Sequence, residues 1–232
     1  MILAAGRGER MRPLTNSIPK PLLKVGSHTL IEHQIINLAR SGFTDIVINH
    51  AYLGEMIEQA LGTGERYGVK IRYSPEKTVL ETAGGVINAM SMLCGSDHNV
   101  PFLVVNADIY CKVDYAHLLS VFEMMHIPTP EHWAHLILVD NPVHHPQGDF
   151  ALKKKEVMLA GDRMLTFSGI GVYHPRLFDN LQPVRMKLAP LLHQAIEGGR
   201  VTGEFFSGTW IDVGTPERLH WLDDQSRNHT LE

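Results

Sequence analysis

Short apolar runs alternate with segments of helical periodicity through the first half of the chain. The apolar runs, which are typical of buried strands, cover residues 1–5, 45–49, 70–74 and 102–105. The segments between them, in which apolar residues recur every three or four positions, cover residues 30–42, 53–61 and 86–93. This alternating order predicts a mainly parallel sheet with helices on both faces. Ligands of such sheets bind at the carboxyl ends of the strands.

The second half of the chain is richer in strands. We expect strands at residues 136–139, 150–153, 165–173 and 201–211. One further helix is predicted at residues 188–196, before Gly198-Gly199, and another follows Pro216. No linker, internal repeat or low-complexity tract separates these segments. We therefore predict a single domain over residues 1–232.

Composition and charge narrow the class of protein. Of the 232 residues, 44% are hydrophobic and 20% are charged, which excludes a disordered chain and predicts a sizeable core. The formal net charge of −4 argues against nucleic-acid binding and against attachment to a membrane surface. No apolar run approaches the ~18 residues of a spanning helix. Two cysteines, Cys94 and Cys111, are too few for a disulfide framework, so we expect a reducing cytoplasm.

The segment after the first predicted strand carries the strongest chemical signal. Residues 3–13 read Leu-Ala-Ala-Gly-Arg-Gly-Glu-Arg-Met-Arg-Pro, and Pro19-Lys20-Pro21 follows. Glycines after a strand let backbone amides approach a phosphate, and Arg10 and Lys20 can neutralise a triphosphate. The segment is neither a P-loop nor a dinucleotide fingerprint, because it lacks Gly-Lys-Ser/Thr and has Met11 at the third glycine position. A purely structural turn is the alternative, but so many cations repel one another without an anion.

This pattern resembles the signature of sugar-1-phosphate nucleotidyltransferases, also called nucleoside-diphosphate-sugar pyrophosphorylases. Three further segments match the family in its order: the base-binding loop at 81–85, the metal aspartate segment Asn106-Ala107-Asp108 and a second metal segment at 210–216. The resemblance implies a three-layer α/β/α, Rossmann-like nucleotidyltransferase fold with a mainly parallel mixed central sheet. It also implies a nucleotide-binding half at about 1–125 and a sugar-phosphate-binding half at about 126–232.

Within this family, the chain most resembles the bacterial N-acetylmuramate-1-phosphate uridylyltransferases. The resemblance rests on residues 47–51, 138–142, 144–150 and 166–169. It implies that UTP and N-acetylmuramate 1-phosphate give a nucleoside-diphosphate sugar and pyrophosphate, in the recycling of cell-wall sugars. The base-binding loop departs from the family at Ala83, where a third consecutive glycine is common.

The expected reaction is an in-line displacement that depends on positioning and charge neutralisation. Its predicted catalytic residues are Arg10, Lys20 and Asp108, and Asp108 and Asp212 are the predicted ligands of Mg²⁺. Structural alternatives are a capping carboxylate for Asp108, a turn carboxylate for Asp212 and a solvated loop lysine for Lys20. The position of Asp108 after a buried strand, and the prolines around Lys20, favour the functional interpretation.

The predicted binding residues lie in the same segments and in the second half of the chain. Those expected to contact the nucleotide are Ala4, Ala5, Gly6, Gly8, Glu9, Arg10, Lys20, Glu81, Gly84, Gly85 and Asn106. Those expected to contact the sugar phosphate are Asn106, Asp140, Gly148, Asp149, Ser168 and Gly169. An exposed helix-start carboxylate is nearly as good an interpretation of Glu81, and surface turns compete for Asp140 and Asp149.

Two alternative functions remain open on the sequence. One keeps the chemistry but changes the substrate, as in mannose-1-phosphate guanylyltransferase or another hexose-1-phosphate nucleotidyltransferase. The other is a nucleotide-binding regulatory subunit without turnover, which the presence of both predicted cations and both aspartates disfavours. The five histidines between positions 126 and 145 lack zinc-ligand spacing and are expected to be solvated. We expect a monomer whose partners are a nucleoside triphosphate and a sugar 1-phosphate.

Overall fold

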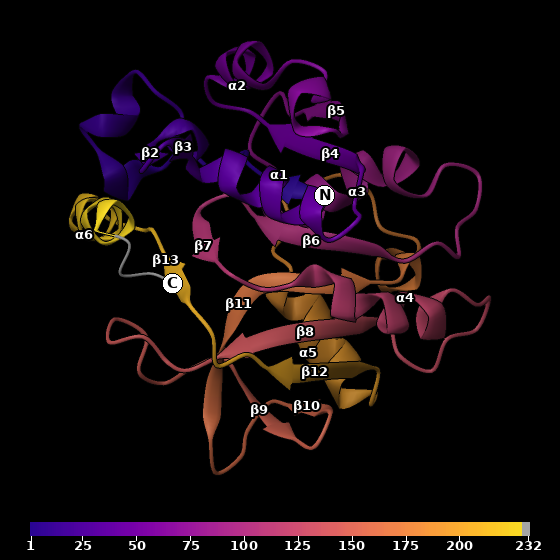
Figure 1. Ribbon diagram of the computed structural model, residues 1–232. Coiled ribbons are helices and arrows are strands. Elements are labelled where there is room, and N and C mark those ends of the chain that lie inside the picture. Colours follow the sequence, from indigo (N-terminus) through magenta and orange to yellow (C-terminus); the bar gives the residue numbers. More distant parts are fainter. Residues whose placement is uncertain (229–232) are drawn as a thin grey trace. The chain divides into compact units, whose positions relative to one another are not determined.

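The computed structural model describes residues 1–228, which form two compact units built from interleaved segments (Figure 1). Unit 1 comprises Met1–Val79, Asn106–Tyr115 and the chain from Thr209 onward, and unit 2 comprises Leu80–Val105 and Ala116–Gly208. The chain therefore passes twice from unit 1 to unit 2 and back. The single domain and its two consecutive halves stay a prediction.

A parallel three-stranded ladder forms the centre of unit 1. Its strands are β1 (Ile2–Leu3), β4 (Asp45–His50) and β5 (Lys70–Pro75), in the order β5-β4-β1. Each falls where an apolar run predicted it. The connecting helices α1 (Leu30–Arg40) and α2 (Gly54–Leu61) also lie where the periodicity placed them. The first half of the pattern therefore gave the correct element types and parallel order in this unit.

Local sequence explains where α1 begins and which face it buries. Thr29 and Glu32 form a capping box, in which the Glu32 carboxylate accepts a hydrogen bond from the Thr29 N–H at 2.7 Å. Ile31, Ile35 and Leu38 form a buried stripe one to two turns long. The apolar face and the cap together fix both the start and the rotation of this helix.

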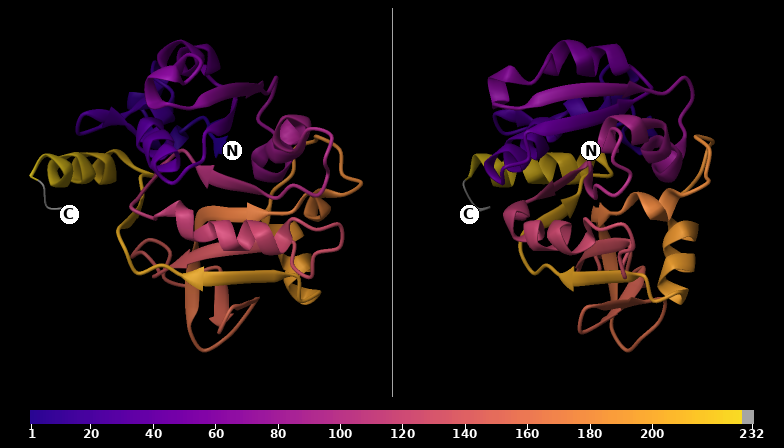
Figure 2. Two further views of the ribbon diagram at one scale, coloured as in Figure 1. Left: turned by 45° about the vertical axis from the view of Figure 1, so that its right-hand side comes forward. Right: turned by 90° about the vertical axis from the view of Figure 1, so that its right-hand side faces the viewer.

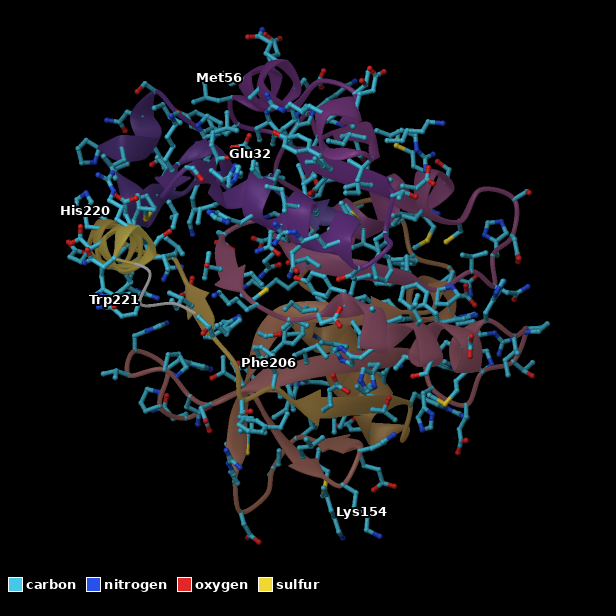
Figure 3. All side chains as sticks on the ribbon, in the orientation of Figure 1. Glu32, Met56, Lys154, Phe206, His220 and Trp221 are labelled. Carbon is cyan, nitrogen blue, oxygen red and sulfur yellow. The ribbon has the colours of Figure 1, made fainter. Side chains whose placement is uncertain are left out.

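A second ladder and a small hairpin complete unit 1. Strand β7 (Ile109–Cys111) pairs antiparallel with β13 (Trp210–Asp212), and β2 (Lys24–Val25) pairs with β3 (His28–Thr29). Helix α6 (Pro216–Arg227) lies beside this hairpin and buries Leu219 and Leu222 in a shared apolar cluster (Figure 1). The opposite surface of α6 is open, since Trp221 is 50% exposed and projects outward (Figure 3).

Unit 2 contains a mixed sheet and three helices. Its strands are β6 (Phe102–Asn106), β8 (Ala134–Val139), β9 (Phe150–Lys153), β10 (Glu156–Met158), β11 (Met164–Tyr173) and β12 (Val201–Phe205). They are ordered β6-β11-β8-β12-β10-β9, and only β8 and β12 pair in parallel. The helices are α3 (Glu81–Cys94), α4 (Leu119–Met125) and α5 (Ala189–Glu197). Helices α4 and α5 cover opposite faces of the sheet (Figure 2).

The structure confirms the α/β class and corrects several details of the prediction. The sheet is mixed, as expected, but antiparallel pairs dominate unit 2 because β11 runs against both of its long neighbours. The strand expected at residues 201–211 is interrupted at residues 206–209, which separate β12 from β13. The turn at Lys154, which has a left-handed φ of 56°, connects two strands of which only the first was expected (Figure 3). No helix within residues 1–228 is long and apolar enough to cross a membrane.

Six short 3-10 helices occur in the loops between these elements. They cover Glu9–Met11, Leu14–Asn16, Lys20–Leu22, Glu65–Tyr67, Tyr115–Leu118 and Pro175–Phe178. The first three follow β1 directly and shape the segment in which the strongest sequence signal lies.

Candidate active site

The loop after β1 is anchored at the carboxyl edge of the parallel ladder. The Ala4 N–H donates to Asn49 Oδ1 at 3.0 Å, and Asn49 Nδ2 donates to Glu76 Oε1 at 2.6 Å. Asn49 and Glu76 are both buried, at 2% and 7% exposure, and lie at the ends of β4 and β5. Sequence reasoning did not place either residue in the site. A polar residue at the end of a buried apolar strand is the signal that could have found Asn49.

The two glycines of this loop have different structural roles. Gly6 is exposed, and a Cβ at this position would meet no atom within 4 Å. Gly8 has a φ of +64°, and its Cβ would lie 3.0 Å from side-chain carbons of both Thr15 and Lys20. Thr15 Oγ1 also donates to the Gly8 carbonyl at 2.8 Å. Gly8 is therefore required by the fold, whereas Gly6 leaves open space beside the backbone.

Three arginines give the loop an uncompensated positive charge. Arg7, Arg10 and Arg12 are all exposed, and none of their side chains makes a hydrogen bond or ion pair with another residue in the described range 1–228. Arg10 lies in the 3-10 helix Glu9–Met11, whose only acidic residue is Glu9. Like charges so close together repel one another, and a bound polyanion would relieve this repulsion.

Lys20, in contrast, is buried and paired. Its Nζ lies 2.6 Å from Asp108 Oδ2, and the two side chains are 8% and 36% exposed. Pro19 and Pro21 restrict the backbone on either side of Lys20. Asp108 is brought beside the glycine loop because the Ala107 N–H donates to the Leu3 carbonyl at 3.0 Å. Two residues 88 positions apart thus meet at the end of β1.

The second predicted acid lies on the strand next to Asp108. The Val213 N–H donates to the Asp108 carbonyl at 3.0 Å, so the backbones of the two acidic segments are adjacent. Asp212 Oδ2 accepts a hydrogen bond from Arg218 Nη1 at 2.7 Å. Sequence reasoning missed Arg218, which lies six residues after Asp212 in the first turn of α6. Each predicted metal ligand therefore forms an ion pair with a basic side chain of unit 1.

These acids suit a divalent cation that shares its ligands with a substrate. Within residues 1–228, no group of three or more His, Cys, Asp or Glu side chains forms a metal cage. Mg²⁺ commonly takes one or two protein carboxylates and completes its coordination with substrate phosphates and water. Asp108 and Asp212 supply two such carboxylates next to a cationic loop. The residues present therefore fit Mg²⁺ that is bound with a phosphate-bearing substrate.

The segment predicted to be a base-binding loop is the first turn of helix α3 in unit 2. The N–H groups of Ala83 and Gly84 donate to the Met186 carbonyl at 3.0 and 3.2 Å. A Cβ on Gly84 would lie 2.2 Å from the carbonyl oxygen of Val184, so this glycine admits the neighbouring chain. Expecting a loop was wrong, because Met186 supplies the acceptor that lets the helix begin at Glu81.

Glu81 and Gly85 belong to the same turn. Glu81 has a left-handed φ of 62°, and its carboxylate accepts a hydrogen bond from Arg185 Nη2 at 2.9 Å. Gly85 is buried within the helix. Contact of this turn with a nucleotide base stays a prediction.

The residues predicted to contact the sugar phosphate also lie in unit 2, apart from Asn106. Ser168 is buried, and its hydroxyl donates to the Ile137 carbonyl at 2.7 Å. Gly169 has a φ of 80° and lies at the irregularity of β11. Asn106, the last residue of β6, is half-buried. The Ser168 hydroxyl thus joins β11 to β8.

The remaining three residues of this set form a turn and a surface ion pair. Asp149 Oδ2 accepts a hydrogen bond from the Phe167 N–H at 2.8 Å, and Gly148 before it has a φ of 66°. Asp140 pairs with Arg163 at 2.7 Å, and its side chain is 74% exposed. The structure shows what these residues do for the fold, and their contact with a sugar stays a prediction.

Comparison with known proteins gives one family over most of the chain. Residues 1–128 match the family model described as nucleotidyl transferase. The chain is 48% identical over 225 residues to the N-acetylmuramate alpha-1-phosphate uridylyltransferase of Neisseria meningitidis serogroup B, with 94% of both chains covered. It is 32% identical over 228 residues to the mannose-1-phosphate guanyltransferase of Schizosaccharomyces pombe, and there it spans only 61% of the relative's length.

Solved structures show the same fold at lower sequence identity. A Bacillus anthracis protein, described provisionally as a glucose-1-phosphate thymidylyltransferase and crystallised with sucrose, aligns with a TM-score of 0.81 and 22% identity. That alignment covers 98% of this chain and 94% of the neighbour. HddC from Yersinia pseudotuberculosis, complexed with GMP-PN, aligns with a TM-score of 0.76 and 18% identity over 97% of both chains.

Proposed function

Because the chain belongs to the nucleotidyl transferase family, we propose that it joins UTP to N-acetylmuramate 1-phosphate and releases pyrophosphate. The observation that carries this choice of substrates is the 48% identity to the Neisseria uridylyltransferase across 94% of both chains. The mannose-1-phosphate guanyltransferases are more distant, at about 30% identity. The product would be the uridine diphosphate sugar.

The chemistry requires two polyanions to meet in line. An oxygen of the sugar phosphate attacks the α-phosphorus of the triphosphate, a new P–O bond forms, and the bond between the α-phosphorus and the bridging oxygen breaks. The attacking phosphate is already ionised at neutral pH, so the protein need not supply a general base. Catalysis then depends on holding the reactants and offsetting their charge.

The residues of unit 1 match these requirements. The open backbone at Gly6 and the unpaired Arg10 would bind the β- and γ-phosphates, and Lys20 would contact the α-phosphate, where charge accumulates. Asp108 and Asp212 would hold Mg²⁺. When bound, Mg²⁺ neutralises charge on the phosphate oxygens. We also propose that the remaining residues predicted to contact the nucleotide and the sugar phosphate do so from the positions described above.

Pyrophosphate release from a matrix of triphosphates and sugar 1-phosphates tests this proposal. We expect UTP with N-acetylmuramate 1-phosphate to give the highest kcat/KM. A higher value for GTP with mannose 1-phosphate would change the substrates and keep the reaction. Tight nucleotide binding without turnover in any pair would identify a regulatory subunit instead.

Three wider properties complete the proposal. Both cysteines are buried and unpaired, which supports a reducing cytoplasm as the compartment. The reaction would serve cell-wall sugar recycling. We expect a monomer, and size-exclusion chromatography with light scattering checks this oligomeric state directly. We also expect no affinity for nucleic acid.

A further inference from the structure

Arg218, in the first turn of α6, holds the Asp212 carboxylate. Arg218 Nη1 donates to Asp212 Oδ2 at 2.7 Å and to the Asp212 backbone carbonyl at 2.9 Å. The two side chains are 24% and 22% exposed, so solvent screens this pair less than a surface pair. Because one nitrogen contacts both the carboxylate and the backbone of Asp212, it fixes the rotation of that side chain.

The local sequence is arranged to permit this contact. Thr215 Oγ1 accepts a hydrogen bond from the Arg218 N–H at 3.4 Å and caps α6, which places Arg218 in the first helical turn. A Cβ on Gly214 would lie 3.1 Å from Asp212 Oδ2 and 3.2 Å from Arg218 Nη2. Gly214 does not have a positive φ. Glycine is needed at this position because it leaves space for the ion pair between Asp212 and Arg218.

The two ion pairs make the acidic site formally neutral. Lys20 offsets the charge of Asp108, and Arg218 offsets that of Asp212. A divalent cation approaching this site would therefore meet two carboxylates and two cations. The attraction of the two carboxylates for the metal ion is largely cancelled by the repulsion from the two cations. A triphosphate brings additional negative charge, which would restore the attraction.

We propose that Arg218 acts through Asp212, whose carboxylate it orients and whose charge it offsets, so that it weakens metal binding in the absence of nucleotide. The ligand-free protein then has little affinity for divalent cations and retains one only together with the nucleotide. This inference rests on the proposed function, because it takes Asp212 as a metal ligand. It does not depend on which sugar or base the protein uses.

Titration of Mn²⁺ into the nucleotide-free, full-length protein tests the inference, with free Mn²⁺ measured by electron paramagnetic resonance. We expect Arg218→Gln to bind Mn²⁺ about tenfold more tightly than the wild type, because it removes a cation beside the site. Arg227→Gln is the matched control. It removes a cation from the same helix, where Arg227 pairs with Asp223 at the same 2.7 Å, and should leave the affinity unchanged. Adding Asp212→Asn to Arg218→Gln should abolish the gain.

An unchanged or lower Mn²⁺ affinity in Arg218→Gln would overturn the inference, since a purely structural arginine would change only the melting temperature. Arg218→Met, which keeps the aliphatic stem, replaces Arg218→Gln if circular dichroism shows that the glutamine variant is unfolded. Wild-type turnover is measured separately. If the wild type turns over the proposed substrates but Arg218→Gln shows no gain in Mn²⁺ affinity, only the role of Arg218 is refuted. If Arg218→Gln shows the gain but the wild type does not turn over these substrates, only the proposed substrates are refuted.

Discussion

At the scale of single residues, the glycine loop shows which features the sequence reveals. The order of residues alone singles out Gly6, Gly8, Arg10 and Lys20 as candidates, because backbone access and positive charge are properties of residue type. The different structural roles of these residues are not visible in the sequence. Only the fold shows that Gly8 packs against Lys20, whereas Gly6 faces open space. Arg218 was missed because its contact with Asp212 depends on how α6 begins.

Gly6→Ala should damage function without damaging the fold. A methyl group at Gly6 meets no atom of the protein within 4 Å but enters the space assigned to the phosphates. We expect kcat/KM for the nucleotide to fall about 10- to 100-fold. Gly198→Ala, at another glycine without positive φ and with ordinary 3.5 Å contacts, is the control. Equal activity of the two variants in a pyrophosphate assay would refute the assignment of this space.

Lys20→Met should remove the cation while preserving the buried stem. By analogy with loss of one preorganised electrostatic donor, we expect kcat to fall roughly 10²- to 10³-fold. Lys24→Met, at an exposed lysine of β2, should have little effect. Steady-state rates at saturating substrates make the comparison. A fall of less than about threefold in Lys20→Met would show that Lys20 only stabilises Asp108.

At the scale of elements, apolar periodicity predicts the long strands and helices but misses several short ones. Strands β7 and β10 have three residues each, which is too few for an alternating pattern to be recognised. The start of α3 was placed too late because Met186, a hundred residues away, supplies its first acceptor. Such tertiary contacts are absent from any local pattern.

The contact between α6 and the β2–β3 hairpin should make stability depend on pH. The Gly26 N–H donates to Asp223 Oδ1 at 2.7 Å, and this hydrogen bond, assisted by Arg227, lowers the pKa of Asp223. A lowered folded-state pKa stabilises the fold above the unfolded pKa of about 4, and this contribution is lost as the pH falls further. We expect Asp223→Asn to lower the free energy of unfolding by about 1 kcal/mol at pH 7.

The same variant should differ less from the wild type at acidic pH. Urea unfolding of both proteins at pH 7 and at pH 3 measures the two differences. A destabilisation that is equal at both pH values would show that the charge of Asp223 does not contribute.

At the scale of the whole molecule, the two cysteines can report whether the two units unfold cooperatively. Cys111 lies in unit 1 and Cys94 in unit 2. Burial, with a contribution from Asp97, raises the pKa of Cys94 to about 11, and burial also raises the pKa of Cys111. Both thiols should therefore react slowly with iodoacetamide in the folded protein at pH 8.

The single-domain prediction requires both thiols to become reactive together. We expect Cys94→Ser and Cys111→Ser, each with one remaining thiol, to show the same urea midpoint for labelling. Two separate midpoints would mean that the units unfold independently. The sequence could not address this point, because the interleaving of the units follows from long-range pairing.

The central claim is that the glycine loop binds a triphosphate whose metal ion lies between Asp108 and Asp212. A crystal structure with Mn²⁺ and a non-hydrolysable UTP analogue tests it most directly, because anomalous scattering locates the metal. The account predicts one Mn²⁺ peak coordinated by an oxygen of each aspartate and by the analogue's phosphates, with these phosphates beside Gly6 and Arg10. A metal peak that contacts neither aspartate, or phosphates bound away from this loop, would contradict it.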